Sequence, residues 1–409
     1  MAASLNLHKA FTGSGSYLAE LEVAANDAVM LTTAREEIRQ TLRAAFQEWS
    51  RHVMRDELFD STLVKSGAEL KLPKPKFRLQ GSFKYGTAND CQQNPPQQID
   101  QDDGVFLPVG FLANNSAFRP SVASKAYFDL VERALRPLCA RKGWRLNPGP
   151  RPKATCVRVE IGPRMHIDLP LYAIRDEAFE RLVETALAKS VIASTATQDA
   201  ALELFDEVYR GLGEQEIMLA HRVEGWIASD PRKLEDWFEA AVQHFGPQLR
   251  RLARAYKGMR DADAPDSELG SIAIMAGLVS ALEALGPQDH SRDDLALLAT
   301  AREMAKVFQH PVENPAFPDD ESKNFCVDWS APFRQAVSDL FNRAADELHE
   351  AIYGTVNKTV ALNHARRAFG NRVPTDTSLV TFVGSVATVI RSEPPQTRVQ
   401  PMPVRTKSG

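Results

Sequence analysis

The sequence lacks the features of a secreted, membrane-spanning or disulfide-stabilised protein. No window reaches the roughly 18 uninterrupted apolar residues of a membrane helix, and the first residues, MAASLNLHKAF, contain no apolar run of the signal-peptide kind. The 4 cysteines include no C-x-x-C pair, which argues against a zinc ribbon and against a disulfide framework. We therefore expect a cytoplasmic protein.

An excess of basic residues is also missing. The 49 Lys and Arg against 53 Asp and Glu give a net charge of -4, so the chain as a whole does not attract long nucleic acid. A local basic cleft remains compatible with this balance. A chain of 409 residues with 44% hydrophobic content is longer than a single compact core usually accommodates, which predicts two lobes.

Hydrophobic periodicity predicts both helices and strands in the first half of the chain. Apolar residues recur at spacings of three and four over about 33–53, which predicts an amphipathic helix, and Thr33 with Glu36 has the form of a capping box at its start. A further helix is predicted over about 121–141. The segment CVRVEIGPRMHIDLPLYAI alternates in the manner of two strands around a Gly-Pro turn, which predicts a hairpin.

The second half has the pattern of helices. From about Lys233 onward, LEDWFEAAVQHFGPQLRRLARAYKGMRDA, SIAIMAGLVSALEAL, LALLATAREMAKVF and PFRQAVSDLFNRAADELHEAI each show helical periodicity. We therefore divide the chain into a core at 1–220 that includes the N-terminal helix, a mostly α-helical lobe at 221–392, and a proline-rich, polar, flexible tail at 393–409.

Three aspartates are candidates for a metal site. IDQDDGVFLPV is typical of a strand, on which Asp100 and Asp102 point to one face about 7 Å apart. In the second arm of the hairpin, Asp168 lies on the face opposite the neighbouring aliphatic side chains. Carboxylates suit Mg²⁺, and two metal ions about 4 Å apart serve phosphoryl transfer. A D-x-D pair alone is more often a solvated strand face, so the context of these residues decides.

That context is a Gly-Ser pair ahead of the strand. In QGSFKYGT, Gly81 and Ser82 can open a short helix whose free backbone N–H groups suit an anion, although in isolation the pair predicts only a helix start. A Gly-Ser helix opening, a D-x-D strand and a third aspartate on a later strand follow in the order of the DNA polymerase β-like nucleotidyltransferase fold, which this chain resembles.

Further separated motifs make the resemblance closer. QGSFKYGT, IDQDDGVFLP, TCVRVEI with HIDLPLYAI, WIASDPRKLEDWF, ARAYKGMRDA and FGNRV occur in one order along most of the chain. Together they resemble the bacterial cyclic GMP-AMP synthase/DncV-like nucleotidyltransferase (CD-NTase) family, nearest its dinucleotide-cyclase branch. The resemblance implies an α+β fold, with a polymerase β-like core of mixed sheet and helices and a mostly α-helical second lobe that closes the nucleotide cleft.

The resemblance also implies the residues of the active site. Asp100, Asp102 and Asp168 would be the catalytic metal ligands for Mg²⁺, for which Mn²⁺ can substitute. Nucleotide contacts are implied at Gln80, Gly81, Ser82, Phe83, Lys84, Tyr85, Arg158, Ser229, Lys257, Ser271 and, through a loose match in PAFPDDESKNF, at Asp319. Without the resemblance, Lys257 would be interpreted as a solvated charge on an amphipathic helix.

The implied activity joins ATP and GTP with release of pyrophosphate. The leading product is 3′,3′-cyclic GMP-AMP, a second messenger of anti-phage (CBASS) defence that activates a separate effector, although other bases are compatible with the same metal site. The chain ends at Gly409, which resembles family members conjugated at the C-terminus by a ubiquitin-like E1/E2 partner.

Two other functions remain open from the residues themselves. The first is a template-independent enzyme that adds nucleotides to an RNA end, which the net charge of -4 disfavours. The second is a non-catalytic nucleotide sensor, which has no need of Asp100, Asp102 and Asp168 together.

Overall fold

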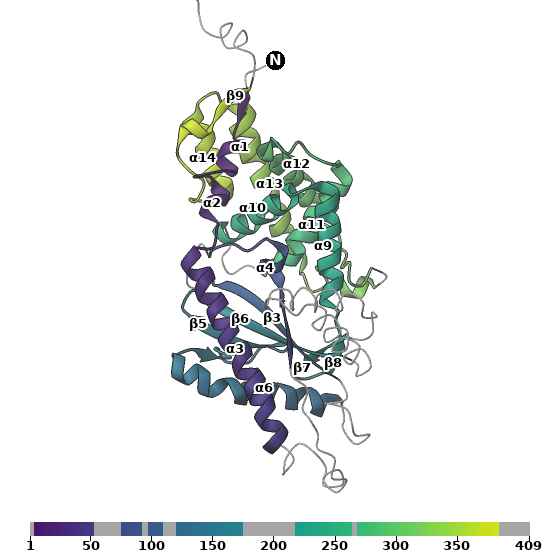
Figure 1. The fold of residues 1–409 in the computed structure, drawn as a ribbon. Coiled ribbons are helices and arrows are strands. Elements are labelled where there is room, and N and C mark those ends of the chain that lie inside the picture. Colours follow the sequence, from purple (N-terminus) through teal and green to yellow (C-terminus); the bar gives the residue numbers. More distant parts are fainter. Residues whose placement is uncertain are drawn as a thin grey trace, which may run out of the picture.

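The chain folds into two lobes, a sheet flanked by long helices and a bundle of helices above it (Figure 1). The computed structural model describes residues 4–52, 75–91, 97–108, 120–174, 217–263, 268–318 and 320–383. The predicted α+β class, with a mixed sheet and a helical second lobe, is confirmed.

Within the described residues, the sheet lobe contains seven strands, of which β2, β3, β6, β5 and β4 are neighbours in that order, with β7 beside β6 and β8 beside β7. Their bounds are β2 (Lys76–Gln80), β3 (Ile99–Pro108), β4 (Arg145–Leu146), β5 (Cys156–Gly162), β6 (Met165–Ile174), β7 (Ile217–His221) and β8 (Gly225–Ala228). β3 and β6 run parallel, and the other pairs are antiparallel. The predicted hairpin is confirmed, because β5 and β6 pair directly across the turn.

Helix α3 (Ala25–His52) begins eight residues before the start that the sequence predicted at Thr33. The capping box was wrong, because Thr33 lies inside the helix, where its hydroxyl donates to Val29 O at 2.8 Å. Glu36 instead accepts a hydrogen bond of 3.0 Å from Arg39 one turn later. A threonine in a helix can satisfy its hydroxyl on the preceding turn, so the motif does not by itself mark a helix start.

Helix α6 (Pro120–Lys142) confirms the helix predicted over about 121–141. Tyr127, Val131, Leu135 and Leu138 recur every three or four residues and are all buried. They belong to one apolar core with residues of α3 and the sheet. Both helices therefore pack on the sheet through this shared core.

The helical lobe confirms the helices predicted after Lys233. Its helices are α9 (Pro231–Phe245), α10 (Gln248–Asp263), α11 (Ser271–Leu285), α12 (Asp293–Val307), α13 (Ala331–His349) and α14 (Lys358–Phe369), with the short turns η2 (Glu321–Lys323), η3 (Glu350–Gly354) and η4 (Thr377–Leu379). Asp230 caps α9 by accepting a 3.0 Å hydrogen bond from Arg232 N.

The first residues of the chain pack in the helical lobe rather than with the sheet. β1 (Ser4–Asn6) pairs with β9 (Thr381–Val383), and α1 (His8–Phe11) and α2 (Tyr17–Glu20) follow it. Leu5 to Leu21 contribute buried side chains to the core of the helical lobe. The sequence predicted that residues 1–220 form one core, but the start of the chain packs in the other lobe. Local periodicity does not show which lobe a short apolar segment will cover.

Hydrogen bonds and a buried ion pair join the lobes around one opening. Arg78 on β2 and Glu235 on α9 form a buried ion pair, with oxygen–nitrogen distances of 2.6 and 3.0 Å. Arg250 on α10 donates to Tyr85 O at 2.9 Å, and Lys257 on the same helix donates to Thr87 O at 2.7 Å. These contacts fix α10 opposite β3.

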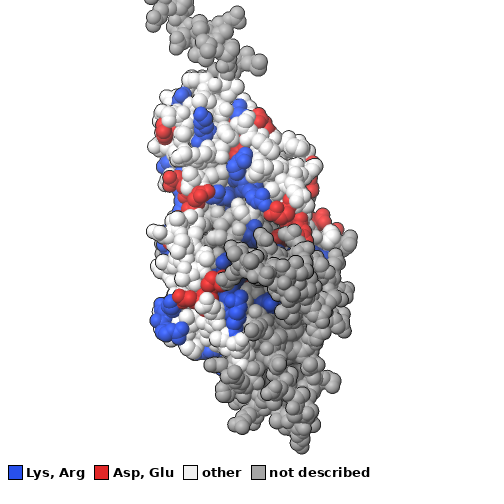
Figure 2. All heavy atoms as spheres, viewed as in Figure 1, with Lys and Arg blue, Asp and Glu red and all other residues white. Residues whose placement is uncertain are grey.

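On the face shown in Figure 2, basic side chains lie beside acidic ones over the described part of the surface. This arrangement agrees with the balanced composition. Within the described ranges, no helix has both the length and the apolar character needed to cross a bilayer. The predicted tail at 393–409 lies outside the residues that the structure describes.

Candidate functional site

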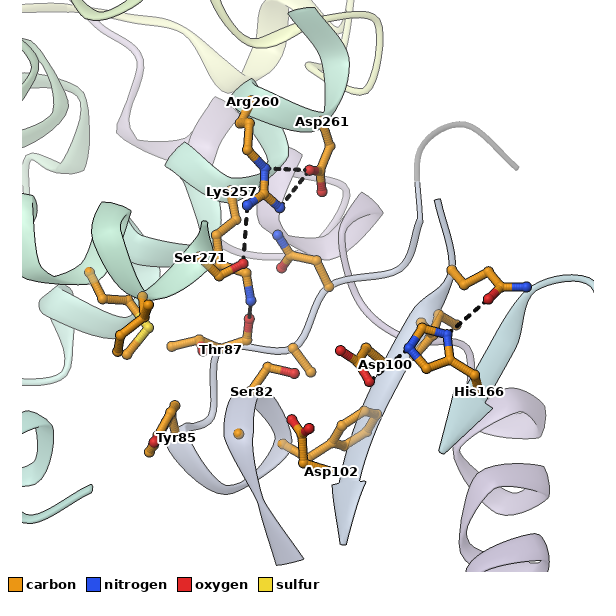
Figure 3. Close-up of a pocket in the computed structure, with 18 residues that line it drawn as sticks. Ser82, Tyr85, Thr87, Asp100, Asp102, His166, Lys257, Arg260, Asp261 and Ser271 are labelled. Atoms are coloured by element: carbon orange, nitrogen blue, oxygen red, sulfur yellow. Dashed lines mark hydrogen bonds and ion pairs between the residues drawn. The ribbon is translucent and has the colours of Figure 1, made fainter. Parts of the chain in front are cut away.

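Asp100, Asp102 and Asp168 come together because β3 and β6 are parallel neighbours. In their register Asp102 lies opposite Asp168, and Asp100 lies opposite His166. Alternation along β3 places both of its aspartates on one face. Figure 3 shows the carboxylates of Asp100 and Asp102 directed into the same space. The three aspartates that the sequence singled out therefore lie close together on adjacent strands.

The carboxylates have different electrostatic surroundings. Burial, and then the negative charges of Asp100 and Asp168, raise the pKa of Asp102 well above its usual value. Burial also opposes ionisation of Asp168, but the hydrogen bonds and charge of Arg158 outweigh burial and lower its pKa. Arg158 Nε and Nη2 each donate to Asp168 at 2.7 Å, and Lys153 Nζ lies 3.1 Å from the same carboxylate.

The site satisfies a test of fit for a divalent cation. Asp100, His166 and Asp168 each present one donor atom, and these atoms all lie within 4.8 Å of one another. Burial and the like charges of Asp100 and Asp168 raise the pKa of Asp102, and a bound cation would favour its ionised form. The oxygen-rich donor set suits Mg²⁺ or Mn²⁺.

A pocket of about 360 Å³ opens between these carboxylates and the helical lobe. From the sheet side it is lined by α4 (Gly81–Tyr85), the loop after it and β3, and from the helical side by α10 and α11. α4 confirms the short helix predicted after Gln80. Gly81 has φ +64°, and a Cβ there would overlap the Asp102 carboxylate, so glycine permits both the turn and the close approach.

Positive groups occupy the side of the pocket opposite the aspartates (Figure 3). Lys257 is buried and donates to Thr87 O at 2.7 Å. Burial, and next the charge of Arg260, lower its pKa to about 8. Arg260 is itself held by Ser271 Oγ at 3.1 Å and by Asp261 Oδ1 at 2.8 Å. The pocket thus has an acidic wall and a basic wall.

The structure brings most predicted residues to this pocket. Its lining includes the predicted residues Gly81, Ser82, Phe83, Tyr85, Asp100, Asp102, Lys257 and Ser271. The lining does not include Gln80, Lys84, Arg158, Asp168 or Ser229. Asp319 and Gly409 lie outside the described residues. The assignment of nucleotide contacts stays a prediction.

Four of the residues outside the lining, Gln80, Lys84, Arg158 and Asp168, have partners within the protein. Gln80 is buried and accepts a 3.2 Å hydrogen bond from Tyr172, and Lys84 lies 3.5 Å from Glu235. Arg158 contacts Asp168 rather than the pocket. The two side chains meet because the register of β5 and β6 places Arg158 directly opposite Asp168.

Sequence reasoning missed several residues that line the pocket. They are Thr87, Ala88, Asn89, Gln98, Ile99, His166, Arg260, Asp261, Ile272 and Met275. For His166 the signal was present, because it shares a strand face with Asp168 two residues later. Arg260 offered a weaker signal, since it follows Lys257 by three residues on one helix face.

Two segments of the chain match models of known protein families. Residues 75–172 match the family model described as "Cyclic GMP-AMP synthase DncV-like, nucleotidyltransferase domain". Residues 246–382 match the model described as "Cyclic GMP-AMP synthase, C-terminal domain". The two matches fall on the sheet lobe and on the helical lobe.

Curated relatives extend the match. A cyclic GMP-AMP synthase of Vibrio cholerae is 31% identical over 317 residues, which cover 73% of this chain and 68% of that protein. A cyclic GMP-AMP synthase of Escherichia coli is 30% identical over 324 residues, 75% of this chain and 70% of that protein.

Solved structures share the fold. The crystal structure of V. cholerae DncV cyclic AMP-GMP synthase aligns with a TM-score of 0.73 and 25% identity over 93% of this chain and 100% of that chain. The same enzyme with the linear intermediate pppA(3′,5′)pG aligns with a TM-score of 0.75 and 24% identity over 94% of this chain and 100% of that chain. The chain therefore belongs to the cyclic GMP-AMP synthase DncV-like family and is a nucleotidyltransferase.

Proposed function

We propose that this enzyme joins ATP and GTP into 3′,3′-cyclic GMP-AMP in two successive transfers, each releasing pyrophosphate. The observation that carries the proposal is the pocket with Asp100 and Asp102 on one wall and Lys257 and Arg260 on the other. Its volume of about 360 Å³ lies in the range of small-molecule sites. The names of the curated relatives, both cyclic GMP-AMP synthases, support this choice of substrates.

Asp100, Asp102 and Asp168 would hold Mg²⁺, for which Mn²⁺ can substitute. When bound, such a cation neutralises the triphosphate and stabilises the entering and leaving oxygens. Arg158 keeps Asp168 ionised, so that its carboxylate can accept a hydrogen bond from the attacking 3′-hydroxyl and orient it. No covalent intermediate with the enzyme is required.

The basic wall would bind the triphosphate. Lys257 is fixed by Thr87 O at 2.7 Å, and Ser271 is fixed by Arg260, so both are oriented before the nucleotide arrives. Ser82 and the backbone of α4 lie on the opposite rim, next to Asp102. The phosphates would then lie between fixed donors and the cation, which lowers the entropic cost of alignment.

The resemblance to the family extends the proposal to biology. The product would act as a second messenger in anti-phage (CBASS) defence by activating a separate effector. A cytoplasmic location follows from the use of ATP and GTP. We further propose conjugation through Gly409 by a ubiquitin-like E1/E2 partner, which co-expression with such proteins and mass spectrometry of the adduct would test.

The test of the reaction is incubation of the purified chain with all four ribonucleoside triphosphates and Mg²⁺ or Mn²⁺. Mass spectrometry resolves the products beside those of the Asp100→Ala/Asp102→Ala variant. A cyclic dinucleotide made only by the wild type supports the proposal and identifies the bases. Extension of a labelled RNA would instead favour an RNA-end-adding enzyme, and nucleotide binding without pyrophosphate release would favour a sensor.

A further inference from the structure

We infer that His166 supplies a nitrogen ligand to the divalent cation at Asp100 and Asp168, so that the site prefers Mn²⁺ to Mg²⁺. This inference rests on the proposed function, because it concerns the cation of the same site. It adds a ligand of a different chemical type to the three carboxylates. Imidazole suits transition-metal ions, whereas Mg²⁺ strongly prefers oxygen.

The first observation is an unsatisfied pair of atoms. His166 is 5% exposed, and its Nε2 lies 2.9 Å from Asp100 Oδ1. Despite this distance, both atoms are buried and have no hydrogen-bond partner within the described part of the chain. Two buried polar atoms that face each other without a hydrogen bond cost free energy unless something else binds both.

Their separation fits a shared cation. Adjacent ligands of an octahedral ion with bonds of about 2.1 Å lie about 3.0 Å apart, which is the edge of the octahedron. The 2.9 Å between Nε2 and Oδ1 matches that edge. One donor oxygen of Asp168 also lies within 4.8 Å of both atoms, as opposite ligands at about twice 2.1 Å would.

The second observation shows that Nδ1 of the imidazole carries a proton. His166 Nδ1 lies 2.9 Å from Gln98 Oε1. The amide nitrogen of Gln98 donates to Glu160 Oε1 at 2.7 Å and to Pro163 O at 3.0 Å, both of which only accept. The orientation of the amide is therefore determined, and its oxygen must accept a proton from Nδ1.

A neutral ring with its proton on Nδ1 leaves a lone pair on Nε2. That lone pair would repel the Asp100 carboxylate at 2.9 Å, whereas a cation that takes both atoms as adjacent ligands would remove the repulsion. Ligating histidines in general donate their other ring N–H to an oxygen that sets the tautomer. Gln98 has this role here, and Arg145 holds Glu160 behind it at 2.5 Å.

The main experiment uses Mn²⁺ alone as the probe on the full chain. Pulsed electron paramagnetic resonance detects nitrogen coupled to the manganese, and ¹⁵N-labelled histidine shifts that coupling without any substitution. We expect a histidine nitrogen coupling in the wild type, and its absence would overturn the inference. This readout does not depend on turnover.

Variants assign the nitrogen. His166→Asn should abolish the coupling and weaken Mn²⁺ binding about tenfold or more, with a smaller change for Mg²⁺. His310→Asn, which removes an exposed imidazole outside the pocket, should change neither. Equal weakening for both metals, or coupling retained in His166→Asn, would contradict the assignment. Circular dichroism confirms that each variant is folded.

The outcomes separate the inference from the proposed function. Nitrogen coupling in a protein that makes no cyclic dinucleotide would leave the ligand in place and refute the proposed reaction. Product formation with no nitrogen coupling would keep the reaction and refute the ligand.

Discussion

Arg158 donates two hydrogen bonds of 2.7 Å, from Nε and Nη2, to the carboxylate of Asp168. The sequence predicted a nucleotide contact for Arg158, but in the structure its guanidinium binds a candidate metal ligand. The two residues face each other across the β5–β6 pair. Bidentate pairing of this kind fixes both the position and the ionisation of the carboxylate.

We therefore expect Arg158→Lys to act on kcat rather than on KM. A lysine cannot form the bidentate pair, so Asp168 would lose its orientation, and we predict a fall in kcat of about 10- to 100-fold with little change in KM for either nucleotide. Steady-state kinetics measure both constants. Lys153→Ala is the control, because it removes one half-exposed partner of Asp168 and keeps Arg158. If Arg158→Lys raises only KM, Arg158 contacts the nucleotide directly, and the proposed effect through Asp168 is wrong.

Gly81→Ala should remove activity beyond its effect on folding. Gly81 and Gly15 have φ of +64° and +67°, so alanine at either position costs about 1–2 kcal/mol of backbone strain. Only at Gly81 would the new Cβ overlap Asp102, whereas nothing lies within 4 Å of a Cβ at Gly15. We expect Gly81→Ala to lose at least as much unfolding free energy as Gly15→Ala, and a fall in activity of about 100-fold for Gly81→Ala alone. Equal activities in the two variants would contradict the role of the close approach.

Lys257 should make stability depend on pH. Burial lowers the pKa of Lys257 from the usual lysine value of 10.5 to about 8, so between these pH values the unfolded state binds more protons. Stability then rises with pH across this window, and the cost of burying the charge is present in full below pH 8. Relative to Lys257→Met, the wild type should gain up to about 3 kcal/mol from pH 7 to pH 11 in urea unfolding. Parallel curves for the two proteins would refute the shift.

The same lysine should make triphosphate binding weaken as pH rises through about 8, because the neutral amine no longer attracts phosphate. Isothermal titration with a triphosphate in the presence of metal measures this affinity. Lys257→Arg should remove the pH dependence, since a guanidinium stays charged. A pH-independent affinity in the wild type would mean that Lys257 does not contact the phosphates.

Asp102→Asn should stabilise the metal-free protein while abolishing synthesis. The pKa of Asp102 is raised, so its ionised form is disfavoured in the folded state and costs stability at neutral pH. Removing that charge should raise Tm by about 2–4 °C, the change that 1 kcal/mol produces in a large domain. Asp236→Asn is the matched control, because Asp236 is exposed on α9 and lies outside the pocket, so its substitution should change neither Tm nor synthesis. Added Mn²⁺ should stabilise the wild type, and EDTA should reverse this effect.

Much of the secondary structure and the chemistry of the acidic wall could be predicted from the sequence alone. Alternation on β3 and β6 placed Asp100, Asp102 and Asp168 on their faces, and these patterns are local. Three- and four-residue spacing located α6 and the helices after Lys233 for the same reason. A local motif failed at Thr33, because the apolar and helix-forming residues before it extend α3 beyond the apparent cap.

Which side chains meet depends instead on long-range packing and strand pairing. The parallel register of β3 and β6 placed His166 opposite Asp100, and the β5–β6 register gave Arg158 to Asp168. Packing of Leu5 to Leu21 into the helical lobe and burial of Lys257 depend on partners more than 150 residues away in sequence. Periodicity shows which face of an element is apolar, but the free energy of long-range packing and pairing selects the element that covers it.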